Sequence, residues 1–499
     1  MQSTHCRHRT VAFGSVLAGG LLGVLVGCGG GSTAPTTPTG DSTDFSGRVL
    51  TVGCDDPSFA RVFSNRARAW AGRTGAVVKV EAQSKDADIQ LLRSPTFGGP
   101  ASRNELAPLP TPLRASSNTR LQWDRLLDIY RMNLASWGEE YLGLPVAGDA
   151  FVVVYRADLI ENANHKAAFS IKFPQKPLGA PGTWEDLADI AAYFTEAQGK
   201  PSLPPLPADP TRLVTQFHQL AACYDRLADT NSRAASKGLG LHFQGENLEH
   251  HRLGLPGFLA TFQWFADTKS SRPPEPSDDP IAALDRGSAV IAVLSLAEVA
   301  RLPKDPATGG VLAKFKVAPL PGTRTYFDAQ GKRSAPGRPN YVPYLGSGGW
   351  IGAVSKTSSN AAAAWELLAE MASMTGSSAM MSEPTAGIGP FRIEHLDATH
   401  NAIWHGHQFD PDRSRDLANA VYQYVSQSIV NPALPLRTPD QAARSTALEV
   451  EIRKAATGKV SANEAQANAV ESWNKLDATQ NPDERTRWRK NSVGLRSDP

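Results

Sequence analysis

The sequence has few cysteines, almost no net charge and, beyond its first segment, no apolar run long enough to cross a membrane. Four cysteines occur among 499 residues, and only Cys54 and Cys223 lie beyond the N-terminal segment, which is too few for a disulfide framework. The formal net charge is +2, so no basic face is expected and nucleic acid is excluded as a partner. A hydrophobic content of 41% and a charged content of 20% indicate a globular body whose core supplies its stability.

The sequence also lacks the short motifs of common enzyme classes and of standard metal sites. It contains no G-x-S-x-G, H-E-x-x-H or C-x-x-C pattern, and no glycine loop of the kind that cradles phosphate. A group of possible metal ligands, His400, His405, His407 and Asp410, has a spacing that suits no standard site. We therefore expect no catalytic residues, no metal and no cofactor.

The first segment has the pattern of a lipoprotein export signal. Arg7 and Arg9 precede an apolar run that ends in Leu-Val-Gly-Cys at Cys28. The run is too short and glycine-rich to span a membrane, and small residues before a cysteine indicate cleavage before Cys28 and lipidation of its thiol. An ordinary secretory peptide with an incidental cysteine is the alternative. We expect an extracytoplasmic protein, in the periplasm or at the cell surface, anchored to a bacterial membrane by lipid and tethered by residues 29–46, which have almost no large apolar side chain.

The body that follows alternates between strand-like and helix-like segments. Residues 48–52 and 76–80 have strand character and flank an amphipathic helix predicted over 58–70. A strand, helix and strand in this order predict parallel pairing with a right-handed crossover. Residues 121–137 are predicted to form a further helix, and residues 151–155 a buried strand. These patterns predict an α/β fold.

Six segments of the body stand in an order that is informative as a set. They are Lys85-Asp86-Ala87-Asp88-Ile89, residues 142–156, Thr183-Trp184-Glu185-Asp186-Leu187, residues 285–289, Pro319-Leu320-Pro321-Gly322 and residues 345–368. In this order they resemble the family 1 extracellular solute-binding proteins of ABC transporters, the maltose-binding-protein-like group, over nearly all of the chain beyond the tether. The resemblance implies a two-lobed periplasmic-binding-protein fold of type II, with a ligand cleft between lobes that hinge strands join.

The resemblance also implies a division of the chain and a function. Lobe I is expected at 47–150 plus about 348–398, and lobe II at 151–347 plus about 399–480, before a solvated polar tail at 481–499. The implied function is that of a monomeric lipoprotein, not an enzyme, which captures a small solute, in the first place a sugar or oligosaccharide, for the permease subunits of an ABC importer. Two alternatives stay open: a periplasmic carbohydrate-active hydrolase, whose carboxylate pair can be distant in sequence, and a ligand-binding lipoprotein that serves a membrane sensor.

Ligands in such folds bind where strands end at the cleft, and this selects the candidate site. Carboxylates there would accept hydrogen bonds from sugar hydroxyls, and the Trp350 indole would stack on a pyranose face. Structural alternatives are helix capping for Asp55 and Asp56, hinge amides for Asp149, core packing for Trp350 and a surface ion pair for Arg392. The candidates are Asp55, Asp56, Ser94, Asp149, Ser295, Gly348, Gly349, Trp350 and Arg392.

The same layout bears on the two cysteines of the body. It implies that Cys54 lies in lobe I at the cleft and Cys223 on a helix of lobe II. A disulfide requires Cα atoms within about 7 Å, and a bond between two lobes that must open would lock them. The resemblance therefore implies two free thiols.

Overall fold

The computed structural model describes residues 44–228, 240–328, 330–346, 349–425, 429 and 431–495, without the side chains of 398–402. The expected lipidation site Cys28 and the candidate Gly348 lie outside the described residues. None of the described helices combines the length and the apolar character that a bilayer crossing needs.

Lobe I, as we name it here, is the part of the chain built on a mixed five-stranded sheet. Its strands are β1 Val49–Gly53, β2 Val77–Glu81, β3 Ile89–Arg93, β6 Leu144–Ala147 and β14 Trp350–Val354. They lie in the order β2-β1-β3-β14-β6. Strand β1 pairs in parallel with β2 and β3, whereas β14 runs antiparallel to β3 and β6. The predicted parallel strand–helix–strand unit is therefore confirmed.

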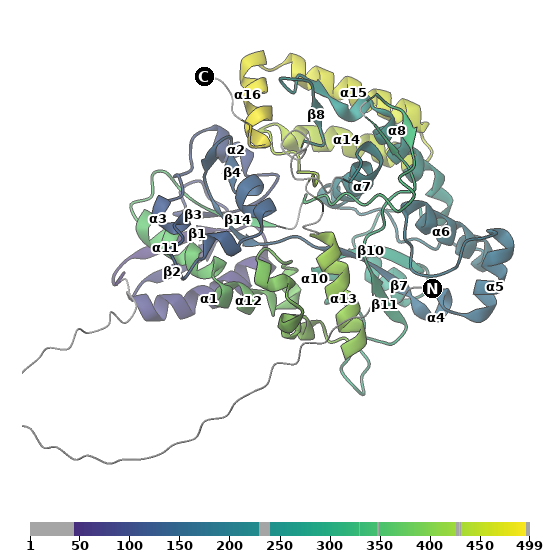
Figure 1. The fold of residues 1–499 in the computed structure, drawn as a ribbon, viewed down its shortest axis with the longest axis horizontal. Helices are drawn as coiled ribbons and strands as arrows, with labels where there is room; N and C mark the ends of the chain where they lie inside the picture. Colours follow the sequence, from purple (N-terminus) through teal and green to yellow (C-terminus); the bar gives the residue numbers. More distant parts are fainter. Residues whose placement is uncertain are drawn as a thin grey trace, which may run out of the picture. The chain divides into compact units, whose positions relative to one another are not determined.

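Helix α1 (Pro57–Thr74) forms because its sequence satisfies both ends and buries one face. The Asp56 carboxylate accepts from the Phe59 amide at the start, and Gly75, with φ of +71°, ends the helix in the left-handed region. A stripe of side chains at helical spacing is buried against the sheet, and α1 runs along its lower side in Figure 1. The buried stripe is Phe59, Val62, Phe63, Ala67, Trp70 and Thr74.

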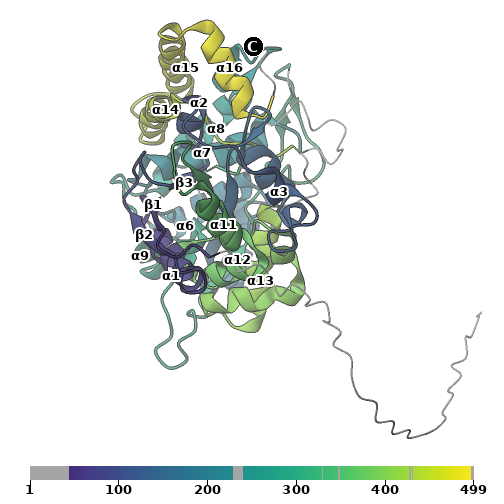
Figure 2. The ribbon, with the colours of Figure 1, turned by 90° about the vertical axis from the view of Figure 1, so that its left-hand side faces the viewer.

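Further short elements and two helices complete lobe I. Helix α11 packs against β6 and against α1, and Figure 2, which looks onto this lobe, shows α1, α3 and α11 on the near side. The bounds are α2 Gly98–Ser102, α3 Thr111–Arg114, η1 Trp123–Arg125, η2 Ile129–Leu134, β4 Ser136–Trp137, β5 Glu140–Tyr141, α11 Ala361–Ala372, α12 Met374–Met381, η6 Pro384–Ala386 and η7 Ile393–Leu396.

The helix predicted over 121–137 is wrong. Gln122 has a φ of +52°, which interrupts any helix, and the segment then forms the 3-10 turn η1, the π-helical turn η2 and strand β4. The hydroxyl of Tyr130, in η2, accepts a hydrogen bond from the Asp149 amide at 2.9 Å. Local helix propensity does not decide the structure of this segment, because its side chains are buried on more than one side.

Lobe II is built on a three-stranded antiparallel sheet in the order β10-β7-β11. These strands are Ile291–Ser295, Phe151–Arg156 and Phe315–Ala318. Helix α13 packs on β11 and β7, and α6 begins at the capping box predicted from Thr183 and Asp186. The other elements are α4 Ala157–Ile160, α5 Ala163–Lys172, α6 Trp184–Gln198, η5 Lys269–Ser271, α9 Pro280–Asp285, α10 Leu296–Val299, β12 Tyr326–Phe327, β13 Arg333–Ser334, η8 Ala398–His407 and α13 Pro411–Tyr424.

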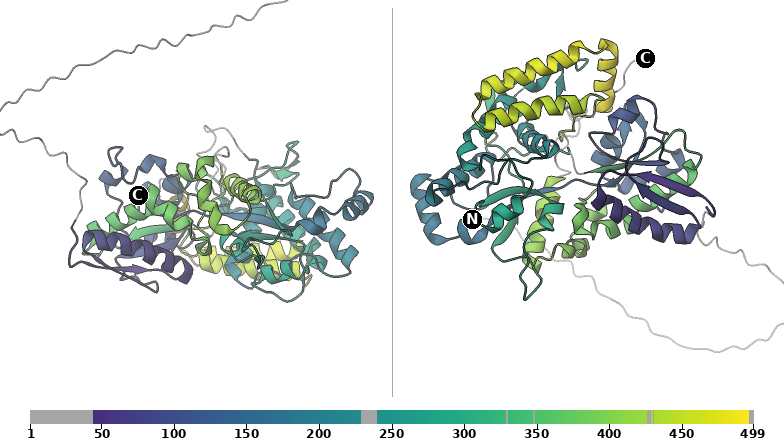
Figure 3. Two further views of the ribbon diagram at one scale, coloured as in Figure 1. Left: turned by 90° about the horizontal axis from the view of Figure 1, so that it is seen from below. Right: turned by 180° about the vertical axis from the view of Figure 1, so that it is seen from behind.

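Helices that are distant in sequence cover lobe II. Helices α14 and α15 lie side by side and pack against α8, and α14 also packs against α7 (Figures 1 and 3). Cys223 lies on α7, as implied, and both Cys54 and Cys223 are buried free thiols. The bounds are α7 Pro210–Asp225, β8 Phe243–Gln244, β9 His250–His251, η4 Arg252–Gly254, α8 Pro256–Asp267, α14 Gln441–Ala456 and α15 Ala462–Ala478.

The C-terminal segment was expected to be a solvated tail because of its basic residues, and this expectation is wrong. Residues Pro482–Ser492 form helix α16, which packs against α2 of lobe I. Arg489 is 1% exposed, donates to the Leu248 and Glu249 carbonyls and forms an ion pair with Asp477 at 2.5 Å. The basic side chain is buried because protein acceptors replace water.

Candidate ligand-binding site

A cavity of about 510 Å³ lies between the two lobes, and most of the residues that line it have polar side chains. Lobe I contributes the start of α1, the end of β3 and the crossing segment after β6. Lobe II contributes the starts of α7 and α10 and the end of β10. The lining residues are Asp56, Ser58, Arg93, Asp149, Ala150, Phe151, Asp209, Thr211, Arg212, Asp278, Ser295, Ala297, Glu298, Trp350, Thr385, Ala386 and Gly387.

Asp56 carries out two roles at the lobe I wall. One carboxylate oxygen accepts from the Phe59 amide at 2.9 Å and so caps α1. The other oxygen accepts from Arg93 Nη2 at 2.7 Å. The cap and the ion pair both fix the carboxylate, and with it the Arg93 guanidinium, at the cavity wall. Helix capping and a place in the site therefore both apply to Asp56.

Trp350 lies at the cavity but cannot offer an indole face to a ligand. Its side chain is 4% exposed, and the Phe59 ring stacks on it with centroids 4.7 Å apart and an interplanar angle of 6°. The Arg93 guanidinium also lies over the indole, with Cζ 4.4 Å from the ring centroid, so a phenyl ring and a guanidinium both pack on the buried indole. The expected stacking platform is wrong for this reason, and core packing applies. The group presented to the cavity is the Arg93 guanidinium.

Asp149 lies where the chain crosses from lobe I to lobe II. It is 2% exposed and lines the cavity. Its backbone amide donates to the Tyr130 hydroxyl at 2.9 Å. Burial first, and then the Asp149 carboxylate, raises the pKa values of Tyr344 and Tyr424 well above their ordinary value. These tyrosines therefore stay protonated, and their hydroxyls bond to other groups: Tyr424 donates to the Tyr344 carbonyl at 2.7 Å, and the Tyr344 hydroxyl lies 3.2 Å from His218 Nδ1.

The crossing segment is held against the strand-like segment at 389–390. The amides and carbonyls of Gly148 and Gly389 exchange two hydrogen bonds, of 3.2 and 3.1 Å. A Cβ atom at Gly148 would lie 2.2 Å from the Pro390 carbonyl oxygen, so only glycine allows this approach. This contact fixes the backbone that carries Asp149.

The lobe II wall is organised by Arg212 and Glu298. The two side chains form an ion pair at 2.5 Å and are 15% and 10% exposed. Glu298 also accepts from the Ser295 amide at 2.9 Å and its hydroxyl at 3.1 Å, which caps α10. Burial raises the pKa of Glu298, and the Arg212 guanidinium opposes this shift. Ser295 therefore lines the cavity, but its hydroxyl donates its hydrogen bond to Glu298.

Four predicted residues do not line the cavity. Asp55 is exposed and accepts from the Gln83 amide at 3.0 Å. Ser94 is 1% exposed, and a Cβ atom at Gly349 would lie 3.3 Å from the Ala147 carbonyl, so both belong to packed interior. Arg392 is fully buried and donates to two backbone carbonyls, of Leu121 and Ala372, at 2.9 and 2.8 Å. Neither a rim contact nor a surface ion pair describes Arg392.

Several cavity residues were missed by sequence reasoning. Asp209 accepts from the Thr211 amide at 2.9 Å and caps α7, which Pro210 begins. Asp-Pro and Ser-x-x-Glu are recognisable helix starts, so Asp209 and Glu298 could have been found as caps. Nothing in the sequence indicates that these two helix starts face Asp56 and Arg93 across a cavity. The missed residues with polar side chains are Ser58, Asp209, Thr211, Arg212, Asp278, Glu298 and Thr385.

Three solved structures have the same fold over most of this chain. An ABC transporter solute-binding protein from Agrobacterium radiobacter K84 in complex with ribitol is 17% identical, with a TM-score of 0.62, and the match covers 87% of this chain and 100% of that one. Maltose-bound MalE3 of T. maritima is 17% identical, with a TM-score of 0.58 and coverage of 86% and 99%. A solute-binding protein from Thermotoga lettingae TMO bound to alpha-D-tagatose is 14% identical, with a TM-score of 0.59 and coverage of 86% and 99%.

The sequence of the chain also matches a protein family. None of the curated proteins compared with the chain matches it. The model of the family described as bacterial extracellular solute-binding protein matches residues 72–403, which is more than half of the chain. The proteins of this family bind solutes outside the cytoplasm, and the two sheets with a polar cavity between them are the arrangement that such binding uses. The chain therefore belongs to the bacterial extracellular solute-binding proteins.

Proposed function

We propose that this protein captures a polyhydroxylated solute, such as a sugar, a sugar alcohol or an oligosaccharide, and delivers it to the permease subunits of an ABC importer. The observation that carries the proposal is the polar cavity of about 510 Å³ to which both lobes contribute charged side chains. The three similar solved structures hold ribitol, maltose and tagatose, all of which are polyhydroxylated. The volume lies in the range of small-molecule sites, about 300–1,000 Å³.

The side chains of the cavity suit hydroxyl groups, which both donate and accept. The carboxylates of Asp56 and Asp149 are placed to accept from ligand hydroxyls, and the guanidinium groups of Arg93 and Arg212 to donate to ligand oxygens. Arg93 lies on the lobe I wall and Arg212 on the lobe II wall. A ligand that contacts both walls stabilises the closed arrangement of the lobes, because it binds that arrangement more tightly than an open one.

A thermal-shift screen of the purified, unliganded protein against sugar alcohols, monosaccharides and oligosaccharides tests this proposal. A ligand at about a hundredfold its dissociation constant stabilises the folded state by about 2.7 kcal/mol, so at least one compound should raise the melting temperature. Small-angle scattering should show contraction with that compound. Stabilisation only by polyamines, metals or phosphate esters would refute the choice of a polyhydroxylated solute.

Two matched variants connect that ligand to the cavity. Asp149→Asn keeps the shape of a buried side chain but removes its charge, and should weaken binding about tenfold or more through the loss of charge-assisted hydrogen bonds. Asp55→Asn makes the same change outside the cavity and should leave affinity unchanged. Equal affinities of the two variants would place the ligand elsewhere.

The proposal includes binding without turnover. The family consists of binding proteins. The alternative, a periplasmic carbohydrate-active hydrolase, would cleave the sugar that it binds. Incubation of the stabilising oligosaccharide with the protein, followed by chromatography of the sugar, should return only the starting compound. A sensor partner in place of an importer would show as a ligand-dependent complex with a membrane receptor domain instead of permease subunits.

We further propose that the body is a monomer held to the membrane by lipid on Cys28. The tether expected at 29–46 ends before Phe45, because the Phe45 amide donates to the Thr74 carbonyl at 2.7 Å and its ring lies 5.7 Å from that of Trp70. The proposed body divides into lobe I at 47–150 plus about 348–398 and lobe II at 151–347 plus about 399–480. Cys28→Ala removes the thiol that would accept the lipid, so the variant should accumulate as uncut, unlipidated precursor. Fatty-acid labelling and the mass of the N-terminal peptide check this. Processed, detergent-free soluble protein from the variant would contradict the lipid anchor.

A further inference from the structure

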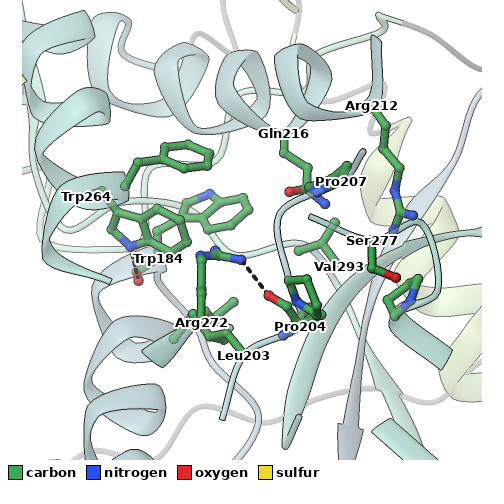
Figure 4. Close-up of a pocket in the computed structure, with 14 residues that line it drawn as sticks. Trp184, Leu203, Pro204, Pro207, Arg212, Gln216, Trp264, Arg272, Ser277 and Val293 are labelled. Atoms are coloured by element: carbon green, nitrogen blue, oxygen red, sulfur yellow. Dashed lines mark hydrogen bonds between the residues drawn. The ribbon is translucent and has the colours of Figure 1, made fainter. Parts of the chain in front are cut away.

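Lobe II contains a second, smaller cavity beside the cleft. It has a volume of about 30 Å³ and lies between α6, α7, α8 and β10 (Figure 4). Its walls are mostly aromatic rings, prolines and aliphatic side chains, with Gln216 and Ser277, and among the described residues that line it only Arg212 and Arg272 are charged. Arg212 also lines the cleft, so the two cavities adjoin. We name this smaller cavity the side pocket.

The side pocket holds an indole donor with no acceptor. Trp184 is 3% exposed, and its Nε1–H has no hydrogen-bond partner among the described residues. The neighbouring Trp264, in T-shaped contact with centroids 5.4 Å apart, donates its own Nε1–H to the Trp184 carbonyl at 2.9 Å. A buried donor without an acceptor destabilises the folded state, and Trp184 lacks the acceptor that Trp264 has.

Arg272 provides a second unpaired donor together with a positive charge. Its Nη1 donates to the Pro204 carbonyl at 3.2 Å, while its Nε–H is buried and has no partner in the described part of the chain. None of the described residues that line the side pocket carries a carboxylate. The guanidinium lies near the rings of Trp264 and Phe265, with Cζ 5.6 and 5.9 Å from their centroids. Burial lowers the pKa of Arg272 to about 10, so the side chain is still a cation at neutral pH. A buried cation of this kind favours an anionic partner.

The size of the side pocket decides which anion it can hold. One water needs roughly 10–15 Å³ of such space, so about 30 Å³ accommodates the three heavy atoms of a carboxylate group but not a sugar ring. Trp184 and Arg272 both line the side pocket, and Figure 4 draws both of them away from Ser277 and Arg212. We propose that the side pocket binds the carboxylate of a small organic acid the size of formate or acetate, through Trp184 Nε1–H and Arg272 Nε–H.

The two proposed donors, Trp184 and Arg272, do not line the cleft, so this site can be tested without knowing which solute the cleft takes. Its carboxylate would lie beside Arg212, whose guanidinium pairs with Glu298 on the cleft wall. Occupation of the side pocket therefore adds a second anion near Arg212. A cleft ligand that relies on Arg212 should then bind with an affinity that depends on the concentration of the small acid.

Indole N–H resonances of the folded protein, labelled with ¹⁵N-tryptophan, test the proposal directly. Titration with sodium formate should shift the Trp184 resonance, assigned by its loss in Trp184→Phe, in a saturable way. Sodium chloride at equal ionic strength should leave that resonance in place. Water in the side pocket would give no saturable shift, and an adventitious ion only would give the same shift with chloride; either outcome overturns the proposal.

Variants at arginine show whether the formate response arises in the side pocket. Arg272→Gln should weaken the formate response about tenfold or more, since a charge-assisted hydrogen bond is lost. Arg286→Gln removes the same charge from an exposed position of lobe II and should leave the response unchanged. If Arg272→Gln does not fold, Arg272→Lys keeps the charge without the Nε–H donor and should show the same weakening. An undiminished response in the folded Arg272 variant would refute the site.

Discussion

Truncation of Trp350 to alanine distinguishes a scaffold residue from a ligand contact. The indole is 4% exposed and packs against the Phe59 ring and the Arg93 guanidinium. Trp350→Ala removes this buried surface and leaves a cavity in lobe I, so it should cost about 3–5 kcal/mol of unfolding free energy with no ligand present. Part of that cost, about 0.5–1.5 kcal/mol, is the aromatic stacking itself. Urea unfolding of the unliganded protein, followed by circular dichroism, measures the change.

A second tryptophan provides the control for this measurement. Trp488 lies on α16 and is partly exposed, so Trp488→Ala removes the same atoms with less buried surface and should cost clearly less. Trp350→Phe keeps an aromatic ring against Phe59 and Arg93 and should also cost less than Trp350→Ala. A cost below about 1 kcal/mol for Trp350→Ala, combined with complete loss of solute binding, would refute core packing and restore the stacking role.

Three further predictions concern buried ionisable groups and one helix cap. Burial lowers the pKa of His218 to about 3 and that of His407 to about 4, whereas in the unfolded chain both histidines take up a proton near pH 6.5. As the pH decreases below 6.5, the free energy of unfolding should therefore decrease by about 1.4 kcal/mol per pH unit for each histidine. Burial raises the pKa of Cys54 to about 11 and that of Cys223 to about 12, so iodoacetamide at pH 8 should modify both thiols only after unfolding. Asp56→Asn keeps the cap of α1 and should change stability by less than about 1 kcal/mol, while Asp56→Ala should cost about 1 kcal/mol more.

Each of these predictions has an internal check. Unfolding curves at pH 7 and pH 5 should converge partly in His218→Gln, whereas replacement of the exposed His250 should leave the pH dependence unchanged. Rapid alkylation of the native protein at Cys223 would show that α7 opens or that the thiol is not buried as described. Equal melting temperatures of Asp56→Asn and Asp56→Ala would mean that the cap of α1 contributes nothing.

Much of the fold was accessible from the sequence, because its signals are local. The apolar stripe of α1, with Asp56 before Pro57, predicts a helix wherever it occurs. The capping box at Thr183 correctly gives the start of α6. The order of strand, helix and strand then restricts β1 and β2 to parallel pairing. Where local signals were absent or misleading, as over 121–137, the prediction failed because burial on several sides replaced helical periodicity.

The candidate site was predicted only in part, because a cavity is made of residues that are distant in the sequence. Asp56, Asp149 and Ser295 follow or precede strands, so their positions near the cleft could be inferred from topology. Arg212 could not be inferred, since its pairing with Glu298 joins the start of α7 to the start of α10.

Most strands and helices follow from the sequence alone and, by resemblance, so does the expectation that two lobes enclose a cleft. The role of each side chain at the cleft could be seen only in the folded chain. Trp350 stands beside glycines in a pattern typical of a ligand contact, but Phe59 and Arg93, distant in sequence, both pack on its indole. Secondary structure follows from periodicities within one segment, whereas the exposure of a side chain depends on every segment that packs against it.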